Sequence, residues 1–203
     1  MKKYEYSGKT REEALALALD ELKTEESNLI INEKEVKSGL FKGKKVVLEV
    51  ILITDINAYI KDAVKNIAKI MGIECNVESK VRDNMLTVSV YSENNNILIG
   101  KNGRTIDALS TIVKQMVHNE IGKQYKFNLD VADYKLKQQR RIESLAKKVA
   151  RDVKRSKIEA KLDPMNSYER RLVHNILNDN KFVYTESEGE EPNRCVVIKP
   201  RED

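Results

Sequence analysis

Tryptophan is absent from this sequence of 203 residues, and all aromatic residues together make up only 5% of it. The two cysteines, Cys75 and Cys195, have no C-x-x-C pattern and no neighbouring histidine, which argues against a disulfide framework and a zinc site. The longest apolar run, residues 46–53, is interrupted by Glu49 and falls far short of the roughly 18 residues that a membrane span needs. No apolar signal core follows the first residues. We therefore predict a protein without a membrane span that resides in the reducing cytoplasm.

Charged residues are abundant, at 34%, and the excess of positive charge is confined to the last third of the chain. The formal net charge is +5, and basic and acidic residues balance up to residue 134. Residues 135–161 hold eleven Lys and Arg against three Asp and Glu. Such a block favours polyanionic partners. A solvated helix face without a partner is the alternative, and the charge pattern alone leaves both open.

Hydrophobic periodicity predicts an α+β protein made of three small domains in series, at residues 1–54, 57–134 and 135–203. The first is a β-α-β-β unit, in which Thr10 and Glu13 form a capping box at the start of the helix. The second has the order α-β-β-α-β. The third is rich in helix, with a long basic helix, a second helix and two short strands.

Side chains in the two outer domains indicate where their cores and surfaces lie. In the first domain, Leu40 and Phe41 stand between two glycines of a turn, where they form a contact point for a partner unless they fold back onto the sheet. In the last domain, Ser167 suits the N-cap of the second helix. The basic helix carries an apolar stripe opposite its cations, formed by Ile142, Leu145, Ala146, Val149 and Val153.

A G-x-x-G motif at residues 100–103 stands between an apolar segment and an amphipathic helix. Glycines let the backbone turn sharply and approach a ligand closely, and the following helix offers unpaired N–H groups at its start. Lys101 and Arg104 add positive charge that suits a sugar-phosphate strand. Alone, the motif is a common helix connection. In the order α-β-β-G-x-x-G-α-β it indicates nucleic-acid binding.

On this order and motif, residues 57–134 resemble a type II K-homology (KH) domain. In such domains the loop clamps the backbone of about four unpaired nucleotides. The resemblance therefore implies that the RNA backbone is held by Gly100, Lys101, Asn102, Gly103 and Arg104. Ile99 and Ile106 either line an apolar groove for the bases or pack in the core.

Arg170 and His174 are four residues apart and therefore share one face of the second helix of the last domain. Arginine can fork onto a phosphate, and histidine can donate a hydrogen bond to another oxygen. The pair follows the basic helix and precedes an acidic loop and Arg194. This combination resembles the R-3-H (Arg-x-x-x-His) domain, a small binder of single-stranded nucleic acid. The resemblance implies contacts from Arg170, His174, Arg171 and Arg194.

The two domains in this order, behind the β-α-β-β unit, resemble the bacterial Jag family, also called the SpoIIIJ-associated or KhpB family. The resemblance implies a cytoplasmic RNA-binding protein that acts in post-transcriptional regulation linked to cell elongation and division. It implies single-stranded RNA as a ligand, with single-stranded DNA left open. It further implies a small separate KH protein and an unidentified protein at the N-terminal domain as partners.

The sequence contains no motif typical of an enzyme. It offers only His118 and His174, and it lacks the P-loop, the dinucleotide-binding motif and paired metal ligands. We therefore predict no catalytic residues, no metal and no cofactor. A protein-protein adaptor with vestigial nucleic-acid surfaces is the alternative function. Because aromatic residues are few, charge contacts with the backbone should outweigh base stacking, which predicts affinity that falls steeply with salt.

Overall fold

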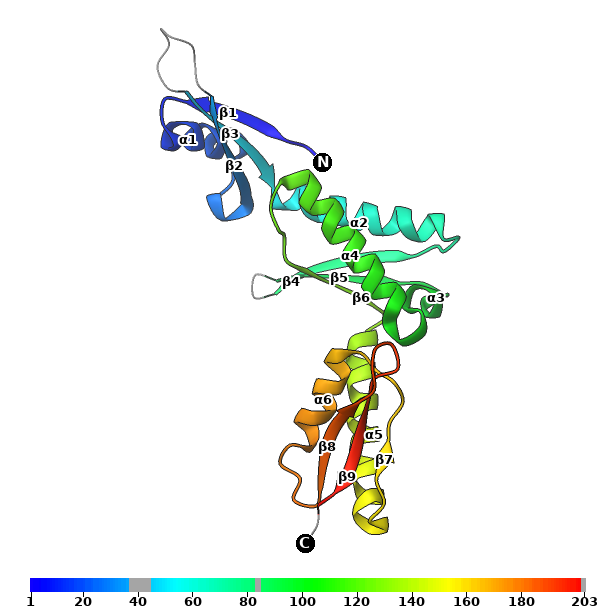
Figure 1. Cartoon of the computed structure of the whole chain (residues 1–203). Coiled ribbons are helices and arrows are strands. Elements are labelled where there is room, and N and C mark those ends of the chain that lie inside the picture. The colour runs from blue at the N-terminus through cyan, green and yellow to red at the C-terminus, as the bar shows by residue number, and fades with distance from the viewer. Residues whose placement is uncertain (37–44, 83–84, 202–203) are drawn as a thin grey trace. The chain divides into compact units, whose positions relative to one another are not determined.

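The computed structural model describes residues 1–36, 45–82 and 85–201, and within these residues the strands form three three-stranded sheets (Figure 1). The chain divides into two compact units, Met1–Ala132 with two of the sheets and Asp133–Asp203 with the third. The predicted α+β class is confirmed. None of the helices in the described part of the chain combines the length and apolarity that crossing a bilayer needs.

The first sheet has the order β1-β3-β2, and both of its strand pairs are antiparallel. Its elements in chain order are β1 (Tyr4–Gly8), α1 (Arg11–Leu22), a short 3-10 helix (Glu26–Asn28), β2 (Leu29–Val36) and β3 (Lys45–Leu52). One face of α1 packs on the sheet because Ala14, Leu15 and Ala18 share a buried cluster with Leu48 and Val50. The predicted turn that holds Leu40 and Phe41 lies outside the described residues.

The start of α1 differs from the predicted capping box in one contact. The Glu13 N–H donates to Thr10 Oγ1 over 3.2 Å, as predicted. The Glu13 carboxylate, however, accepts from the Lys9 N–H over 2.7 Å instead of from the Thr10 N–H. The carboxylate therefore reaches one residue further back along the chain than the sequence motif indicates.

The second sheet has the order β4-β5-β6, with β4 antiparallel and β6 parallel to β5. The elements in chain order are α2 (Ile53–Ile70), β4 (Asn76–Arg82), β5 (Met85–Tyr91), α3 (Asn95–Ile99), a 3-10 turn (Lys101–Gly103), α4 (Arg104–Ile121) and β6 (Phe127–Val131). A parallel neighbour requires a crossover connection, which α3 and α4 supply between β5 and β6. Leu86, Val88 and Val90 alternate inward along β5 and are buried.

Two element boundaries in this part differ from the prediction. Helix α2 begins at Ile53, immediately after β3, whereas the sequence ended the first predicted domain at residue 54 and began the second at residue 57. The apolar run at residues 46–53 extends from β3 into the first residue of α2, so the hydrophobic pattern does not mark the boundary between them. Helix α3 includes the apolar segment before the G-x-x-G motif, for which the sequence predicted no helix. It has five residues, of which only Leu98 is buried, and this length is too short to show helical periodicity.

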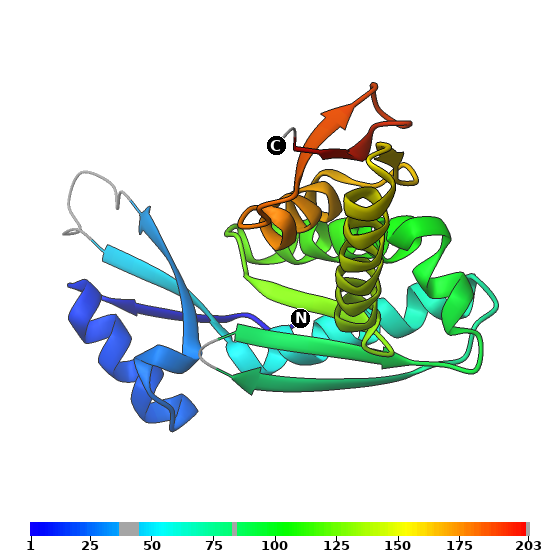
Figure 2. The ribbon, with the colours of Figure 1, turned by 90° about the horizontal axis from the view of Figure 1, so that it is seen from below.

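The second unit packs two helices on a sheet of order β7-β9-β8. Its elements are α5 (Tyr134–Ser156), β7 (Ala160–Lys161), α6 (Ser167–Leu177), β8 (Val183–Glu188) and β9 (Cys195–Pro200). Helices α5 and α6 lie side by side (Figures 1 and 2). The core between helices and sheet includes Ile142, Ala146, Val173, Val196 and Ile198.

Two predictions for this unit are wrong in detail. Leu145, assigned to the apolar stripe, is 39% exposed, because the buried residues of α5 are Ile142, Ala146, Ala150 and Val153, in steps of four, four and three. The N-cap of α6 is Asn166 and not Ser167, which is the first residue of the helix. The Asn166 side chain accepts from the Glu169 N–H, and the Glu169 carboxylate accepts from the Asn166 N–H. This capping box fixes the start of the helix that carries Arg-x-x-x-His.

Candidate nucleic-acid interface

The G-x-x-G motif forms a tight loop between α3 and α4, with three of its four residues at positive φ. The φ angle is +71° at Gly100, +54° at Asn102 and +77° at Gly103. The Gly103 N–H donates to the Gly100 carbonyl oxygen over 3.3 Å and closes the loop. Glycine adopts this conformation without strain, and asparagine tolerates it better than most residues. The residue types of the motif therefore suit the positive φ angles of its backbone.

Gly100 has no room for a side chain. A Cβ atom at this position would lie 2.0 Å from Thr105 Oγ1 and 3.0 Å from Thr105 N, in the first turn of α4. The sequence indicated that the glycines allow a ligand to approach. The structure adds a second reason for Gly100, which is the packing of the loop against its own helix.

The outer side of the loop combines cationic side chains with helix amides. The side chains of Lys101, Asn102 and Arg104 are exposed, whereas Gly103 is buried. Gly103 precedes the first turn of α4 and has no side chain that could cap it. The positive end of the dipole of this 18-residue helix therefore faces any ligand that binds at the loop. This arrangement suits an anionic backbone.

The two aliphatic residues beside the loop differ in exposure. Ile106 is 1% exposed and belongs to the core. Ile99 is half-buried at the end of α3. Of the two interpretations open for Ile106, core packing is therefore the correct one.

Helix α6 places Arg170 and His174 one turn apart, and the Arg170 guanidinium is already paired. Arg170 is only 8% exposed. Its Nη1 donates to the Met165 carbonyl oxygen over 2.9 Å and to Glu191 Oε1 over 2.7 Å. Glu191 belongs to the acidic loop between β8 and β9, and its side chain is 62% exposed. In this structure a carboxylate thus takes the place beside Arg170 that the sequence assigned to a phosphate.

His174 is half-buried between α6 and β8, where both ring nitrogens contact hydroxyl groups. Its Nδ1 lies 2.6 Å from Thr185 Oγ1, and its Nε2 lies 2.9 Å from Ser187 Oγ. Burial, and secondarily the positive charge of Arg170, lowers the pKa of His174 below its ordinary value. The neutral ring, with one nitrogen donating and the other accepting, is therefore the form that the fold stabilises.

The lowered pKa of His174 predicts that the second unit loses stability in acid. The histidine of the unfolded chain, with a pKa of about 6.5, binds a proton more readily than that of the folded chain. The free energy of unfolding should therefore fall as the pH drops below about 6.5. Urea unfolding between neutral and mildly acidic pH, followed by far-UV circular dichroism, measures this. The dependence should shrink in His174→Gln and persist in His118→Gln, and equal curves for wild type and His174→Gln would contradict it.

The other two predicted residues of this unit point outward. Arg171 and Arg194 are both exposed, on α6 and on the loop before β9. Tyr168 is 67% exposed and lies three residues before Arg171, hence on the same face of α6. The four predicted residues thus divide into an inner pair, Arg170 and His174, and an outer pair that is open to solvent.

Charge is segregated within the second unit. The cations on α5 are exposed, and this set includes Arg140, Arg141, Lys148, Arg151 and Lys154. On β8, Thr185 and Ser187 face the helices, so the alternating residues Glu186 and Glu188 face away from them. Lys199 Nζ lies 2.6 Å from Glu186 Oε2 and 2.9 Å from Glu188 Oε1. The helix side is therefore basic, whereas acidic groups gather on the outer face of the sheet.

Comparison with protein families matches two segments of the chain. Residues 57–129 match the KhpA/KhpB KH domain, and residues 140–200 match the R-3-H domain. The RNA-binding protein KhpB of Clostridium symbiosum is 33% identical over 95% of this chain and 89% of its own length. The chain belongs to the KhpB family. The RNA-binding protein KhpB of Bacillus subtilis (strain 168) shares 27% identity over 95% of each chain. The RNA-binding protein KhpB of Streptococcus pneumoniae serotype 2 shares 27% identity over 93% of this chain and 55% of its own length.

Membership of the KhpB family confirms the resemblance drawn from the two motifs. Sequence reasoning missed one participant in the second motif, which is Glu191 as the partner of Arg170. The signal was the acidic loop that precedes Arg194, between β8 and β9, since a buried arginine needs a nearby carboxylate. Which carboxylate of that loop pairs with it depends on the path of the backbone.

Proposed function

We propose that this chain binds single-stranded RNA without catalysing a reaction. The proposed sites are the G-x-x-G loop of a KH domain at residues 57–134 and an R-3-H domain at residues 135–203, preceded by a β-α-β-β domain at residues 1–54. The observation that carries the proposal is the exposure of Lys101 and Arg104 beside the uncapped N-terminus of α4. The names of the KhpB relatives, which call them RNA-binding proteins, support the choice of ligand.

At the loop, the strand is held by its phosphates. Lys101 and Arg104 supply charge, and the amides at the start of α4 supply hydrogen-bond donors together with the helix dipole, worth about 0.3–1 kcal/mol. The side chains of Lys101 and Asn102 are exposed and therefore accessible to a ligand. Binding of this kind falls with salt, since each phosphate contact releases counterions.

In the R-3-H domain, Arg171, Arg194 and the cations of α5 form the open surface for the backbone. Arg170 Nη1 donates to the Met165 carbonyl and to Glu191, so a phosphate contacts this nitrogen by replacing Glu191. His174 keeps Thr185 and Ser187 in place and offers a ring nitrogen once either hydroxyl turns away. Two moderate sites in one chain then gain affinity through effective concentration.

The process in which this binding takes part belongs to the same proposal. We place the chain in post-transcriptional regulation linked to cell elongation and division, in the cytoplasm. The proposed protein partners are a small separate KH protein and an unidentified protein at the β-α-β-β domain. Single-stranded DNA is a second ligand to be compared with RNA of the same sequence.

The double substitution Lys101→Asp with Asn102→Asp tests the loop in the intact chain. It sets negative charge against the phosphates, so the Kd for a labelled single-stranded RNA should rise at least about tenfold, or about 1.4 kcal/mol. Fluorescence anisotropy measures the Kd at two salt concentrations. Asn66→Asp with Lys69→Asp makes the same change of charge on exposed positions of α2 and serves as the control.

The outcome separates RNA binding from the adaptor alternative. A Kd that rises in the loop variant and not in the control places the strand at the loop. An unchanged Kd in both variants overturns the loop as a binding site. The adaptor interpretation is then favoured, and the same variants would be tested for capture of a protein partner.

A further inference from the structure

The Arg170 guanidinium has one fixed acceptor and one exchangeable acceptor on the same nitrogen. Its Nη1 donates to the Met165 carbonyl oxygen over 2.9 Å and to Glu191 Oε1 over 2.7 Å. The Met165 carbonyl is a backbone group, and Met165 is itself held in place because its N–H donates to the Arg194 carbonyl oxygen over 3.1 Å. The Glu191 carboxylate ends a side chain. It can therefore leave the guanidinium by a rotation of that side chain, without a change in the backbone.

The exposure of the two charged partners makes this exchange uneven. The Arg170 side chain is 9% exposed, whereas the Glu191 side chain is 62% exposed. A buried guanidinium needs an anion beside it, whereas an exposed carboxylate is solvated by water when the pair separates. An incoming anion that finds Glu191 in place meets a pair whose charges largely cancel. Binding of an anion at Arg170 is therefore an exchange, in which the new anion enters and the carboxylate returns to water.

Two exposed cations adjoin the point of exchange. Arg171 is the next residue of α6, and Arg194 lies three residues after Glu191 in the loop between β8 and β9. The hydrogen bond from Met165 to Arg194 fixes that part of the loop beside the segment that holds Arg170. A strand bound to these exposed cations brings its phosphates close to Arg170. Such a phosphate competes with the carboxylate at a high effective concentration.

We propose that Glu191 is an internal competitor of RNA, which pairs with Arg170 in the free chain and is displaced when a phosphate of the strand takes its place. The inference rests on the proposed function, since it concerns the strand bound at the R-3-H domain. The contact is autoinhibitory, because the affinity for RNA falls with the fraction of molecules in which the carboxylate occupies Nη1. The carboxylate stays attached to the chain beside Arg170, so it also re-forms the pair whenever the phosphate detaches.

The test replaces the carboxylate with an amide of the same shape in the full chain. Glu191→Gln keeps an oxygen that can accept from Arg170 but removes the negative charge. We expect its Kd for a fluorescently labelled ten-nucleotide RNA to fall about fivefold, the size expected for an ion pair with one exposed member. Glu190→Gln makes the same change of charge at the exposed neighbouring position of the loop and should lower the Kd less than about twofold.

The rates of binding separate competition from a general effect of charge. Removing a charge at the rim of an interface changes mainly the association rate, whereas a change at a buried charged group alters mainly the dissociation rate. Stopped-flow measurements should therefore show slower dissociation in Glu191→Gln. In Glu190→Gln the dissociation rate should stay close to wild type.

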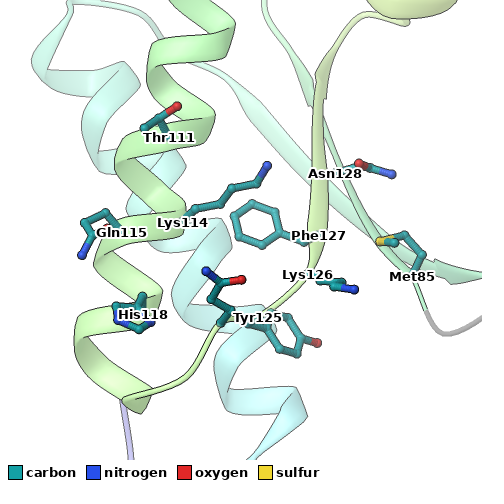
Figure 3. A pocket seen from close by; sticks show the side chains of 10 residues that line it. Met85, Thr111, Lys114, Gln115, His118, Tyr125, Lys126, Phe127 and Asn128 are labelled. Atoms are coloured by element: carbon teal, nitrogen blue, oxygen red, sulfur yellow. The ribbon is translucent and has the colours of Figure 1, made fainter.

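Binding by the first unit has to be weakened so that the contribution of the R-3-H domain is seen. The same titrations are therefore repeated in the background Lys101→Asp/Asn102→Asp. Lys114, which extends from α4 toward β6 at a pocket of about 570 Å³, is a further exposed cation of that unit (Figure 3). Lys114→Glu is added to the background for this reason. The fivefold gain from Glu191→Gln should persist there, because its origin lies in the second unit.

A second measurement follows the carboxylate directly. The carboxyl carbon of Glu191 is observed by ¹³C NMR while the ten-nucleotide RNA is added. Its resonance should move toward that of the solvated Glu190 carboxyl carbon, because the group leaves the guanidinium for water. A Glu191 resonance that does not move at saturating RNA means that the pair stays intact, and it overturns the proposal.

The Kd values give two further outcomes that overturn the competition. Equal changes in Glu191→Gln and Glu190→Gln mean that only the overall charge of the loop matters. Weaker binding in Glu191→Gln means that Glu191 holds Arg170 in the orientation that binds RNA, which makes it a positioning residue and not a competitor.

The failure of this inference is distinct from the failure of the proposed function. If Arg171→Ala weakens RNA binding and Glu191→Gln leaves the Kd unchanged, only the competition is rejected. If neither variant changes the Kd, the R-3-H part of the proposed function is rejected together with the inference.

Discussion

Replacing Gly100 with alanine is expected to lower the free energy of unfolding of the first unit by roughly 3 kcal/mol or more. Two costs combine at this position. Its backbone, with φ +71° and ψ 178°, lies in a region that is essentially restricted to glycine and costs an L-residue about 1–3 kcal/mol. The added Cβ would also lie 2.0 Å from Thr105 Oγ1 and 2.8 Å from Thr105 Cβ, so the first turn of α4 must shift.

The matched control for this substitution is Gly72→Ala. Gly72 has a φ of +76°, nearly the same as Gly100, but no heavy atom lies within 4 Å of a Cβ built there. Only the backbone strain of about 1–2 kcal/mol should therefore appear. Urea unfolding followed by circular dichroism gives both values. Equal losses in the two variants would mean that the contact with Thr105 carries no energy, and the reason given for Gly100 would be wrong.

Arg170→Ala is expected to destabilise the second unit by about 2 kcal/mol, whether or not RNA is present. The substitution removes the hydrogen bonds of Nη1 to Met165 and to Glu191 and leaves a void where a nearly buried side chain stood. The exposure of Glu191 keeps the loss below that of a fully buried ion pair, since its carboxylate can return to water. Arg171→Ala, at the exposed neighbouring position, should change stability by no more than about 0.5 kcal/mol.

This pair of variants decides how a loss of RNA binding is to be interpreted. Both substitutions remove one positive charge from the same helix. Weaker binding in Arg171→Ala with normal stability indicates a direct contact with the strand. Weaker binding in Arg170→Ala indicates a contact only if the unit remains folded under the assay conditions, which its unfolding curve establishes. An unfolding curve of Arg170→Ala identical to wild type would contradict a structural role for the pair with Glu191.

The sequence predicted the elements well wherever apolar residues recur over several turns or alternate along a strand. The apolar pattern at residues 29–36 and 127–131 predicts strands, and the structure has β2 and β6 over these residues. The G-x-x-G loop lies where expected, because its glycines sit at positive φ between two helices. Helix α3 and strand β7 were missed, since five and two residues carry too little periodic signal.

The roles of side chains at the second motif were harder to predict than its position. The spacing of Arg170 and His174 puts them on one face, but it does not say whether that face meets solvent or the sheet. The face meets β8 and the following loop, where Thr185, Ser187 and Glu191 pair with the two side chains. Contacts between residues 11 to 21 positions apart depend on the tertiary fold, which no local pattern encodes.

The segregation of charge in the second unit affects the diffusional encounter between the chain and a nucleic acid. Helix α5, with 23 residues, is about 35 Å long, several times the screening distance of about 8 Å at physiological ionic strength. A polyanion that approaches the outer face of the sheet meets Glu186 and Glu188, whose negative charge is offset only in part by Lys199. A polyanion that approaches α5 instead meets an excess of exposed cations. The charge pattern thus favours encounters at the helix side before any specific contact forms, and added salt should slow association.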